Sequence, residues 1–177
     1  MKFEVEYSGN KQILEEQNTL GIFVSRSRTK YSLEIAHEIV IQFHSLYIFY
    51  ITLPAYERLN LQNHPGRFVV IYDSENWYKR KSIKSELDIK VKNNEVVDRK
   101  TEYLFLDLFI AQKVRNILIL EATRYSKNLE IIGTYCAERG LNVFCLPGRI
   151  TDPSSTGTNK MIFNGAIPLY SLDLLNV

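Results

Sequence analysis

Cysteine is scarce in this chain of 177 residues, and so are long apolar runs. Only Cys136 and Cys145 are present, one in an expected helix and one in an apolar strand, so we expect two buried free thiols in a reducing cytoplasm. Residues 1–6 lack the apolar core of a signal peptide. The most apolar stretch, residues 46–54, is far shorter than the roughly twenty residues that span a membrane. We therefore expect a cytoplasmic protein that does not interact with membranes.

An excess of charge of one sign is also absent. The formal net charge of +2 is too small to imply a polyanionic partner by itself, so a nucleic-acid site would have to be a local basic patch. A hydrophobic content of 45% with 24% charged residues is typical of a globular domain. We expect a single domain over residues 1–177, in which 1–18 form a weakly patterned N-terminal segment and 73–100 a polar insert.

The common signatures of catalysis are missing as well. His37, His44 and His64 do not stand with cysteines or carboxylates at the spacing of metal ligands. No nucleophile elbow, Walker loop or pair of catalytic carboxylates occurs. No glycine lies between Phe23 and Leu33, which excludes a dinucleotide-binding fingerprint after the first apolar run. We therefore expect a protein that is not an enzyme and that uses no cofactor and no metal.

What the chain does contain is an alternation of apolar runs and amphipathic segments. Continuous apolar runs are typical of parallel strands that helices cover on both faces. They occupy residues 20–24, 46–52, 68–72, 116–121 and 142–146. Helical periodicity marks residues 31–43, 102–114 and 129–139, and a short helix is expected at 159–164. This order predicts an α/β fold, a Rossmann-like doubly wound and mainly parallel sheet in a three-layer arrangement.

A basic loop rich in hydroxyl groups, residues 25–30, follows the first apolar strand. In an open α/β sheet, ligands bind beyond the carboxyl ends of the strands, where such a loop lies. Ser25, Arg26 and Arg28 would then line a binding crevice. The alternative is a basic loop that only faces water.

The stretch from Val143 to Ala166, VFCLPGRITDPSSTGTNKMIFNGA, combines a strand, a wide polar loop and a short helix. Free backbone N–H groups at the start of that helix, hydroxyl groups, and the cations Arg149 and Lys160 would converge where an anion such as phosphate binds. The alternative is an ordinary connection between a strand and a helix.

The same stretch carries a resemblance. It fits the pattern P-G-x6-S-x-G-x-N-x-[LM]-I-x-x-G-A without a gap, through Pro147, Gly148, Ser155, Gly157, Asn159, Met161, Ile162, Gly165 and Ala166. This pattern resembles the DNA-processing protein A family (DprA, also called Smf). Ile117 to Ala122 matches the family's V-[LV]-V-V-E-A, and Ser25 and Arg26 match its first Rossmann loop. Two motifs diverge: S-G-L-A-R-G-I-D is lost after Thr52, and R-N-R-I-I-A reads Leu106 to Ala111.

The resemblance implies a non-enzymatic single-stranded DNA-binding protein that forms a homodimer and hands DNA to the recombinase RecA in natural transformation. Its motifs match Ser25, Arg26, Pro147, Gly148, Ser155, Gly157 and Asn159, and the charges of the two loops add Arg28, Arg149 and Lys160. These ten residues are the predicted DNA or phosphate contacts. The resemblance also places a dimer surface at the apolar end of the chain, residues 167–177. Two alternatives remain open: a module for a nucleotide or phosphorylated metabolite in the same crevice, and a degenerate scaffold that has lost ligand binding.

The polar insert offers a competing DNA site. Trp77 and Tyr78 stand beside Lys79, Arg80 and Lys81, and single-stranded nucleic acid binds through base stacking and neutralisation of its backbone. A solvated loop is the simpler interpretation, because runs of Lys and Arg usually face water.

Overall fold

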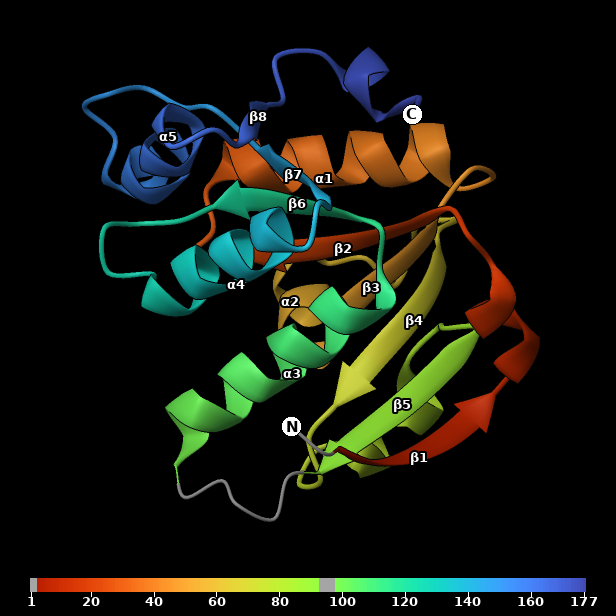
Figure 1. The fold of residues 1–177 in the computed structure, drawn as a ribbon. Coiled ribbons are helices and arrows are strands. Elements are labelled where there is room, and N and C mark those ends of the chain that lie inside the picture. Colours follow the sequence, from red (N-terminus) through yellow and green to blue (C-terminus); the bar gives the residue numbers. More distant parts are fainter. Residues whose placement is uncertain (1–2, 93–97) are drawn as a thin grey trace.

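A computed structural model describes residues 3–92 and 98–177 (Figure 1). Its centre is an eight-stranded sheet with the strand order β1-β5-β4-β3-β2-β6-β7-β8. The strands are β1 (Glu4–Gly9), β2 (Thr19–Val24), β3 (Ile48–Thr52), β4 (Arg67–Tyr72), β5 (Leu87–Lys92), β6 (Asn116–Glu121), β7 (Asn142–Cys145) and β8 (Ile167–Pro168). All neighbours are parallel except β1 and β5, which pair antiparallel.

Helices cover both faces of the sheet. The helices α1 (Lys30–Phe43) and α2 (Leu53–Arg58) pack on one face, and α3 (Arg99–Lys113) and α4 (Lys127–Glu138) pack on the other (Figure 1). The short α5 (Thr156–Phe163) lies beside β6 and β7. Each face has its own buried apolar cluster. The predicted three-layer, doubly wound, mainly parallel fold is confirmed.

The sequence accounts for how α1 begins and which face it buries. Thr29 caps the helix: its hydroxyl accepts a hydrogen bond from the Ser32 N–H, and the Ser32 hydroxyl accepts one from the Thr29 N–H, both at 3.2 Å. Ala36, Ile39, Val40 and Phe43 then recur at helical spacing and are all buried. The loop before α1, which holds the basic residues, is therefore held firmly at its end.

The two segments with the weakest patterns both contribute to the sheet. Residues 1–18 include β1 and a 3-10 turn (Lys11–Glu15). Residues 73–100 include a second 3-10 turn (Trp77–Ser82) and β5, which pairs with β4 and β1. Part of the expected polar insert is thus a sheet strand, in which Leu87, Ile89 and Val91 are buried. Residues 93–97 of that segment lie outside the described residues.

Cys136 and Cys145 are buried free thiols, as the sequence predicts. Burial raises the pKa of Cys136 to about 11 and that of Cys145 to about 12, so neither is a reactive thiolate at neutral pH. Within residues 3–92 and 98–177, no helix has the length and apolar character needed to cross a membrane.

Candidate functional site

A large cavity opens at the carboxyl ends of the adjacent strands β2 and β6, the switch point of the sheet. From the adjacent strands β2 and β6 the chain continues into α1 and α4, which cover opposite faces, and such a switch point leaves a crevice at the carboxyl ends of the strands. The cavity there, called the central cavity below, has a volume of about 910 Å³. Its wall combines residues that follow β2, β3 and β6 with the N-terminal halves of α3 and α4.

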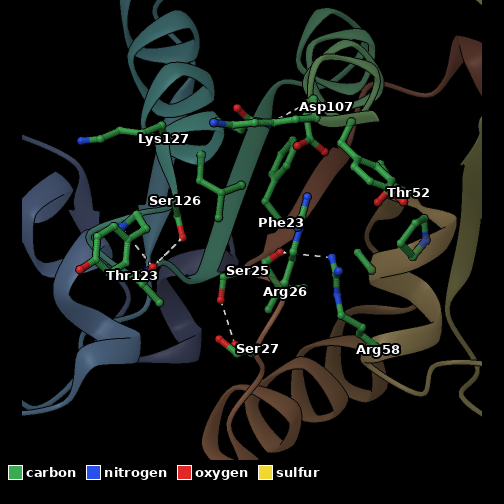
Figure 2. Close-up of a pocket in the computed structure, with 18 of the residues that line it drawn as sticks. Phe23, Ser25, Arg26, Ser27, Thr52, Arg58, Asp107, Thr123, Ser126 and Lys127 are labelled. Atoms are coloured by element: carbon green, nitrogen blue, oxygen red, sulfur yellow. Dashed lines mark hydrogen bonds between the residues drawn. The ribbon is translucent and has the colours of Figure 1, made fainter. Parts of the chain in front are cut away.

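Five cationic side chains and one acidic side chain line the central cavity. The cations are Arg26, Arg58, Arg99, Lys100 and Lys127, and the acid is Asp107. Two of the cations make exposed ion pairs at 3.3 and 3.4 Å, Arg99 with Glu75 and Lys127 with Glu130, and such pairs are weak and exchange easily. Figure 2 shows Arg26 and Arg58 directed into the cavity beneath Asp107. The electrostatic character of this cavity suits an anion.

Arg58 is a site residue that the sequence does not reveal. It stands at the end of α2, a short helix with Pro54 in its first turn, and α2 turns the side chain back over the end of β2. One terminal N–H group donates to the Val24 carbonyl at 3.4 Å, while Nε is buried without a hydrogen-bond partner among the described residues. Arg58 supplies a guanidinium after β3, where the family's S-G-L-A-R-G-I-D arginine is missing from the sequence.

Asp107, on α3, contributes a half-buried carboxyl group to the same cavity. Burial raises its pKa to about 7, and the nearby Arg58 lowers it in part. In the part of the chain that the structure describes, Asp107 makes neither a hydrogen bond nor a direct ion pair. It is therefore a carboxyl group with unused hydrogen-bonding capacity that titrates near neutral pH.

The basic loop after β2 places only some of its predicted residues in the central cavity. Ser25 and Arg26 line it, and Arg26 lies 5.9 Å from the centre of the Tyr103 ring. The Ser25 hydroxyl donates to the Ser27 carbonyl at 2.9 Å. Arg28 is exposed and lines neither this cavity nor the second one described next. Arg26 is thus the cation of this loop that faces the crevice.

The loop after β7 lines a second cavity of about 610 Å³. Pro147, Gly148, Arg149 and Ser155 border it, together with the acidic residues Glu121 and Asp152. Glu121 accepts hydrogen bonds from the N–H (2.8 Å) and the hydroxyl (3.1 Å) of Thr29. The two halves of the predicted phosphate site therefore face separate cavities, and the second one holds no excess of cations.

The residues of the P-G-x6-S-x-G-x-N pattern bond to one another. The Asn159 amide group accepts from the Gly148 N–H at 3.1 Å and donates to the Gly148 carbonyl at 3.0 Å. The Ser155 hydroxyl donates to the Arg149 carbonyl at 2.9 Å, and the Gly157 N–H donates to the Ala122 carbonyl at 2.6 Å. The pattern thus closes the loop and docks α5 against the end of β6.

Besides Arg28, three of the predicted residues line neither cavity. Gly157 and Asn159 serve the internal contacts just described, and the Lys160 ammonium group lies 3.3 Å from Glu130 on α4. Lys160 is thus not among the residues that line the central cavity, although Glu130 also pairs with Lys127, which does line it. Sequence spacing placed Lys160 on the right helix, but the direction of its side chain depends on how α5 packs against α4.

Of the two adjacent aromatic residues in the polar segment, Trp77 and Tyr78, Trp77 makes its contacts within the protein. The Trp77 indole N–H donates to Glu6 at 3.1 Å, and the Arg80 guanidinium lies 4.5 Å from the ring centre. The Tyr72 ring packs edge-on against it at 5.5 Å. Tyr78 alone of the pair is largely exposed, at 68%. This segment therefore offers less free stacking surface than its sequence indicates.

The fold defines a Rossmann-like α/β protein of the kind found in DNA-processing protein A. DprA from Streptococcus pneumoniae superposes with a TM-score of 0.78 at 21% identity, over 96% of this chain and 64% of that chain. DprA from Helicobacter pylori superposes with a TM-score of 0.75 at 14% identity, over 97% of this chain and 85% of that chain. The chain thus spans less than two thirds of the S. pneumoniae protein.

The fold resemblance expected from the sequence is confirmed by these two structures. The sequence matches no protein-family model and no curated protein.

Proposed function

We propose that this protein binds single-stranded DNA in the central cavity and acts without catalysis. The observation that carries the proposal is the ring of five cations around a cavity of about 910 Å³ at the carboxyl ends of β2, β3 and β6. The shared fold supports it, because the H. pylori protein is described by its mode of binding single-stranded DNA.

The chemistry of the cavity agrees with a single-stranded polyanion. Arginine grips phosphate through two parallel N–H groups, and Arg26 and Arg58 both face the cavity. Tyr103 and Tyr125 line the same cavity and provide aromatic rings near the cations, the combination on which bases stack. The Ser25 hydroxyl already donates to a backbone carbonyl and no histidine borders the described cavity, which favours binding over catalysis.

A nucleotide or phosphorylated metabolite is the second candidate. The cavity lies within the range of about 300 to 1,000 Å³ that is usual for small-molecule sites. The retained cations argue against a scaffold that has lost ligand binding altogether.

The proposal includes a homodimer formed at the edge of the sheet where β8 lies. Leu169 and Leu175 of the expected apolar end are buried within the chain, so they are not available to a partner. Phe163, Tyr170 and Val177 stay exposed, at 90%, 76% and 65%. A second copy packed two-fold across this edge would cover them. Transfer of the bound strand to the recombinase RecA in natural transformation is the role that the family resemblance adds.

A binding titration with a labelled thymidine oligonucleotide of about twelve nucleotides tests the proposal, a length within the roughly four to sixteen nucleotides that one OB fold covers. We expect saturable binding that weakens steeply with salt, because cations on the protein release counterions from the strand. A mononucleotide competitor separates the two candidates. Strong binding of the mononucleotide with no oligonucleotide binding would favour the small-molecule candidate, and no binding of either at low salt would contradict both.

A further inference from the structure

Arg58 and Asp107 face the central cavity from opposite layers of the protein. Arg58 comes from α2 on one face of the sheet, and Asp107 from α3 on the other (Figure 2). They are close enough for each to affect the pKa of the other, yet they form no direct ion pair. One terminal nitrogen of Arg58 donates to the Val24 carbonyl and Nε is enclosed, but the other terminal nitrogen makes no hydrogen bond within the described residues. The Asp107 carboxyl group makes none there either. A donor and an acceptor thus stand unused on either side of one space.

A carboxylate is out of place in a cavity that binds phosphate. When Asp107 is ionised, it repels the DNA backbone and weakens its binding unless the ligand donates a hydrogen bond to the carboxylate. Within a DNA strand, the phosphates and the deoxyribose offer only acceptors, and every N–H donor belongs to a base. The group that meets Asp107 in a bound strand is therefore the edge of a base.

The four bases differ in how well their hydrogen-bonding groups match Asp107 and Arg58. Guanine presents its N1–H and N2–H groups side by side, which fits the two oxygens of a carboxylate, and its O6 acceptor lies next to them for Arg58. Adenine and cytosine each present one amino group beside a ring nitrogen whose lone pair would face the carboxylate. Thymine presents one N–H between two carbonyl oxygens. Charge-assisted pairs of hydrogen bonds are the strongest and the most selective.

We propose that Asp107 and Arg58 form a subsite for a guanine base, so that the protein prefers guanine-containing single strands. Asp107 accepts from N1–H and N2–H, and Arg58 donates to O6. The preference rests on the proposed function, because it requires that a single strand enter the central cavity. The same two residues would leave the other cations of the cavity free for the backbone.

The test compares labelled oligonucleotides of equal length built from repeats of TTG, TTA, TTC and TTT, so that the register of binding does not matter. We expect the TTG strand to bind about tenfold more tightly than the other three, as one well-formed pair of hydrogen bonds to a base allows. A strand with deoxyinosine in place of guanine lacks the N2 amino group and should fall between TTG and TTT. Equal binding of all four strands by the parent protein would overturn the subsite and leave the proposed function standing. Absence of binding to all four would overturn both.

A variant protein links the preference to Asp107. Asp107→Asn keeps the shape of the side chain but replaces one acceptor by a donor, and we expect the ratio of TTG to TTA affinity to fall to about one. Lys160→Ala, which changes a cation outside both cavities, should keep the parent's ratio. A ratio that survives in Asp107→Asn would overturn the assignment of Asp107. A thermal unfolding curve for each variant shows that the comparison is made between folded proteins.

Discussion

Gly157 is the residue of the P-G-x6-S-x-G-x-N pattern whose replacement has the most clearly defined consequence. A Cβ atom there would lie 2.7 Å from the Ala122 and Thr123 carbonyl oxygens and 2.8 Å from the Ala122 Cβ. These are backbone atoms at the end of β6 and the methyl group of a fully buried residue, so α5 must move away from the strand. Overpacking of this kind costs about 1 to 3 kcal/mol.

For a chain of this size, a loss of 1 to 3 kcal/mol corresponds to a decrease in Tm of about 3 to 10 °C. Thermal unfolding of Gly157→Ala, followed by circular dichroism, measures it. The matched control is Gly133→Ala in the middle of α4, where the new Cβ would lie 3.3 Å from the flexible Met161 thioether. The control should keep the parent's Tm or exceed it, because alanine favours helix by up to about 1 kcal/mol over glycine. A Gly157→Ala protein as stable as the parent would refute the docking of α5 on β6.

Three further predictions concern the loop, the cavity and the assembly. Asn159→Ala removes the two hydrogen bonds to Gly148 and should lower the free energy of unfolding, measured by chemical denaturation, by about 1 to 2 kcal/mol. The free energy of unfolding of the control, Lys160→Ala, should stay within about 0.5 kcal/mol of the parent's. Equal effects of the two substitutions would contradict the closure of the loop by Asn159. In the folded protein Asp107 keeps its proton up to a pKa of about 7, whereas in the unfolded chain it loses the proton around the ordinary pKa of 3.8. Asp107 therefore lowers stability as pH rises through that window, and the nearby Arg58 opposes part of the loss. Asp107→Asn should be more stable than the parent at pH 8, by an amount that shrinks at pH 5, and the same difference at both pH values would contradict the raised pKa of Asp107. Light scattering of the parent protein at tens of micromolar should give the mass of a dimer. Tyr170→Glu places a charge on an exposed ring position and should shift the measured mass toward that of the monomer. A parent protein with the mass of a monomer at these concentrations would contradict the proposed homodimer.

The strands with continuous apolar runs could be predicted because both of their faces are buried. Every residue of β2, β3 and β6 is buried, so no polar face interrupts their sequences. Phe3, Val5 and Tyr7 alternate with polar residues, a pattern typical of an edge strand, and β1 forms there. Its antiparallel pairing with β5 is not visible in the sequence. Apolar residues that recur with a 3.6-residue period identified the helices α1, α3 and α4.

The helix α2 was not predicted, and the short strand expected at residues 90–97 is found earlier, as β5 (Leu87–Lys92), while residues 93–97 lie outside the described residues. The helix α2 has six residues, too few to show a period, and it begins with a proline. The strand β5 alternates Leu87, Ile89 and Val91 with polar residues and lies within a charged segment. One of those polar residues, Asp88, is buried, where it accepts hydrogen bonds from the Tyr72 (2.9 Å) and Ser85 (2.7 Å) hydroxyl groups. The buried partners of a polar residue are not visible in a linear sequence.

The sequence predicted a phosphate site at the carboxyl end of the sheet, and of its residues Ser25 and Arg26 line the central cavity, while the binding site itself stays a prediction. The loops after β2 and β7 do lie at the carboxyl end of the sheet, as the strand order requires. The pattern around Gly148 and Asn159 is specific because these residues fit one another, so it indicates the fold. Arg58 and Asp107 enter the cavity from helices on opposite faces of the sheet, so their proximity depends on the packing of all three layers.

The central claim is that the central cavity, at the carboxyl ends of β2, β3 and β6, binds single-stranded DNA through the cations that line it. The most direct test measures the affinity of a thymidine oligonucleotide at several salt concentrations for Arg26→Ala and Arg58→Ala, beside Lys160→Ala and Lys79→Ala as cations outside the cavity. We predict that each cavity variant binds several-fold more weakly and loses about 0.7 from the slope of log affinity against log salt, while the two controls match the parent. If Lys79→Ala weakens binding and Arg26→Ala and Arg58→Ala do not, the strand lies on the polar segment and the cavity assignment is wrong.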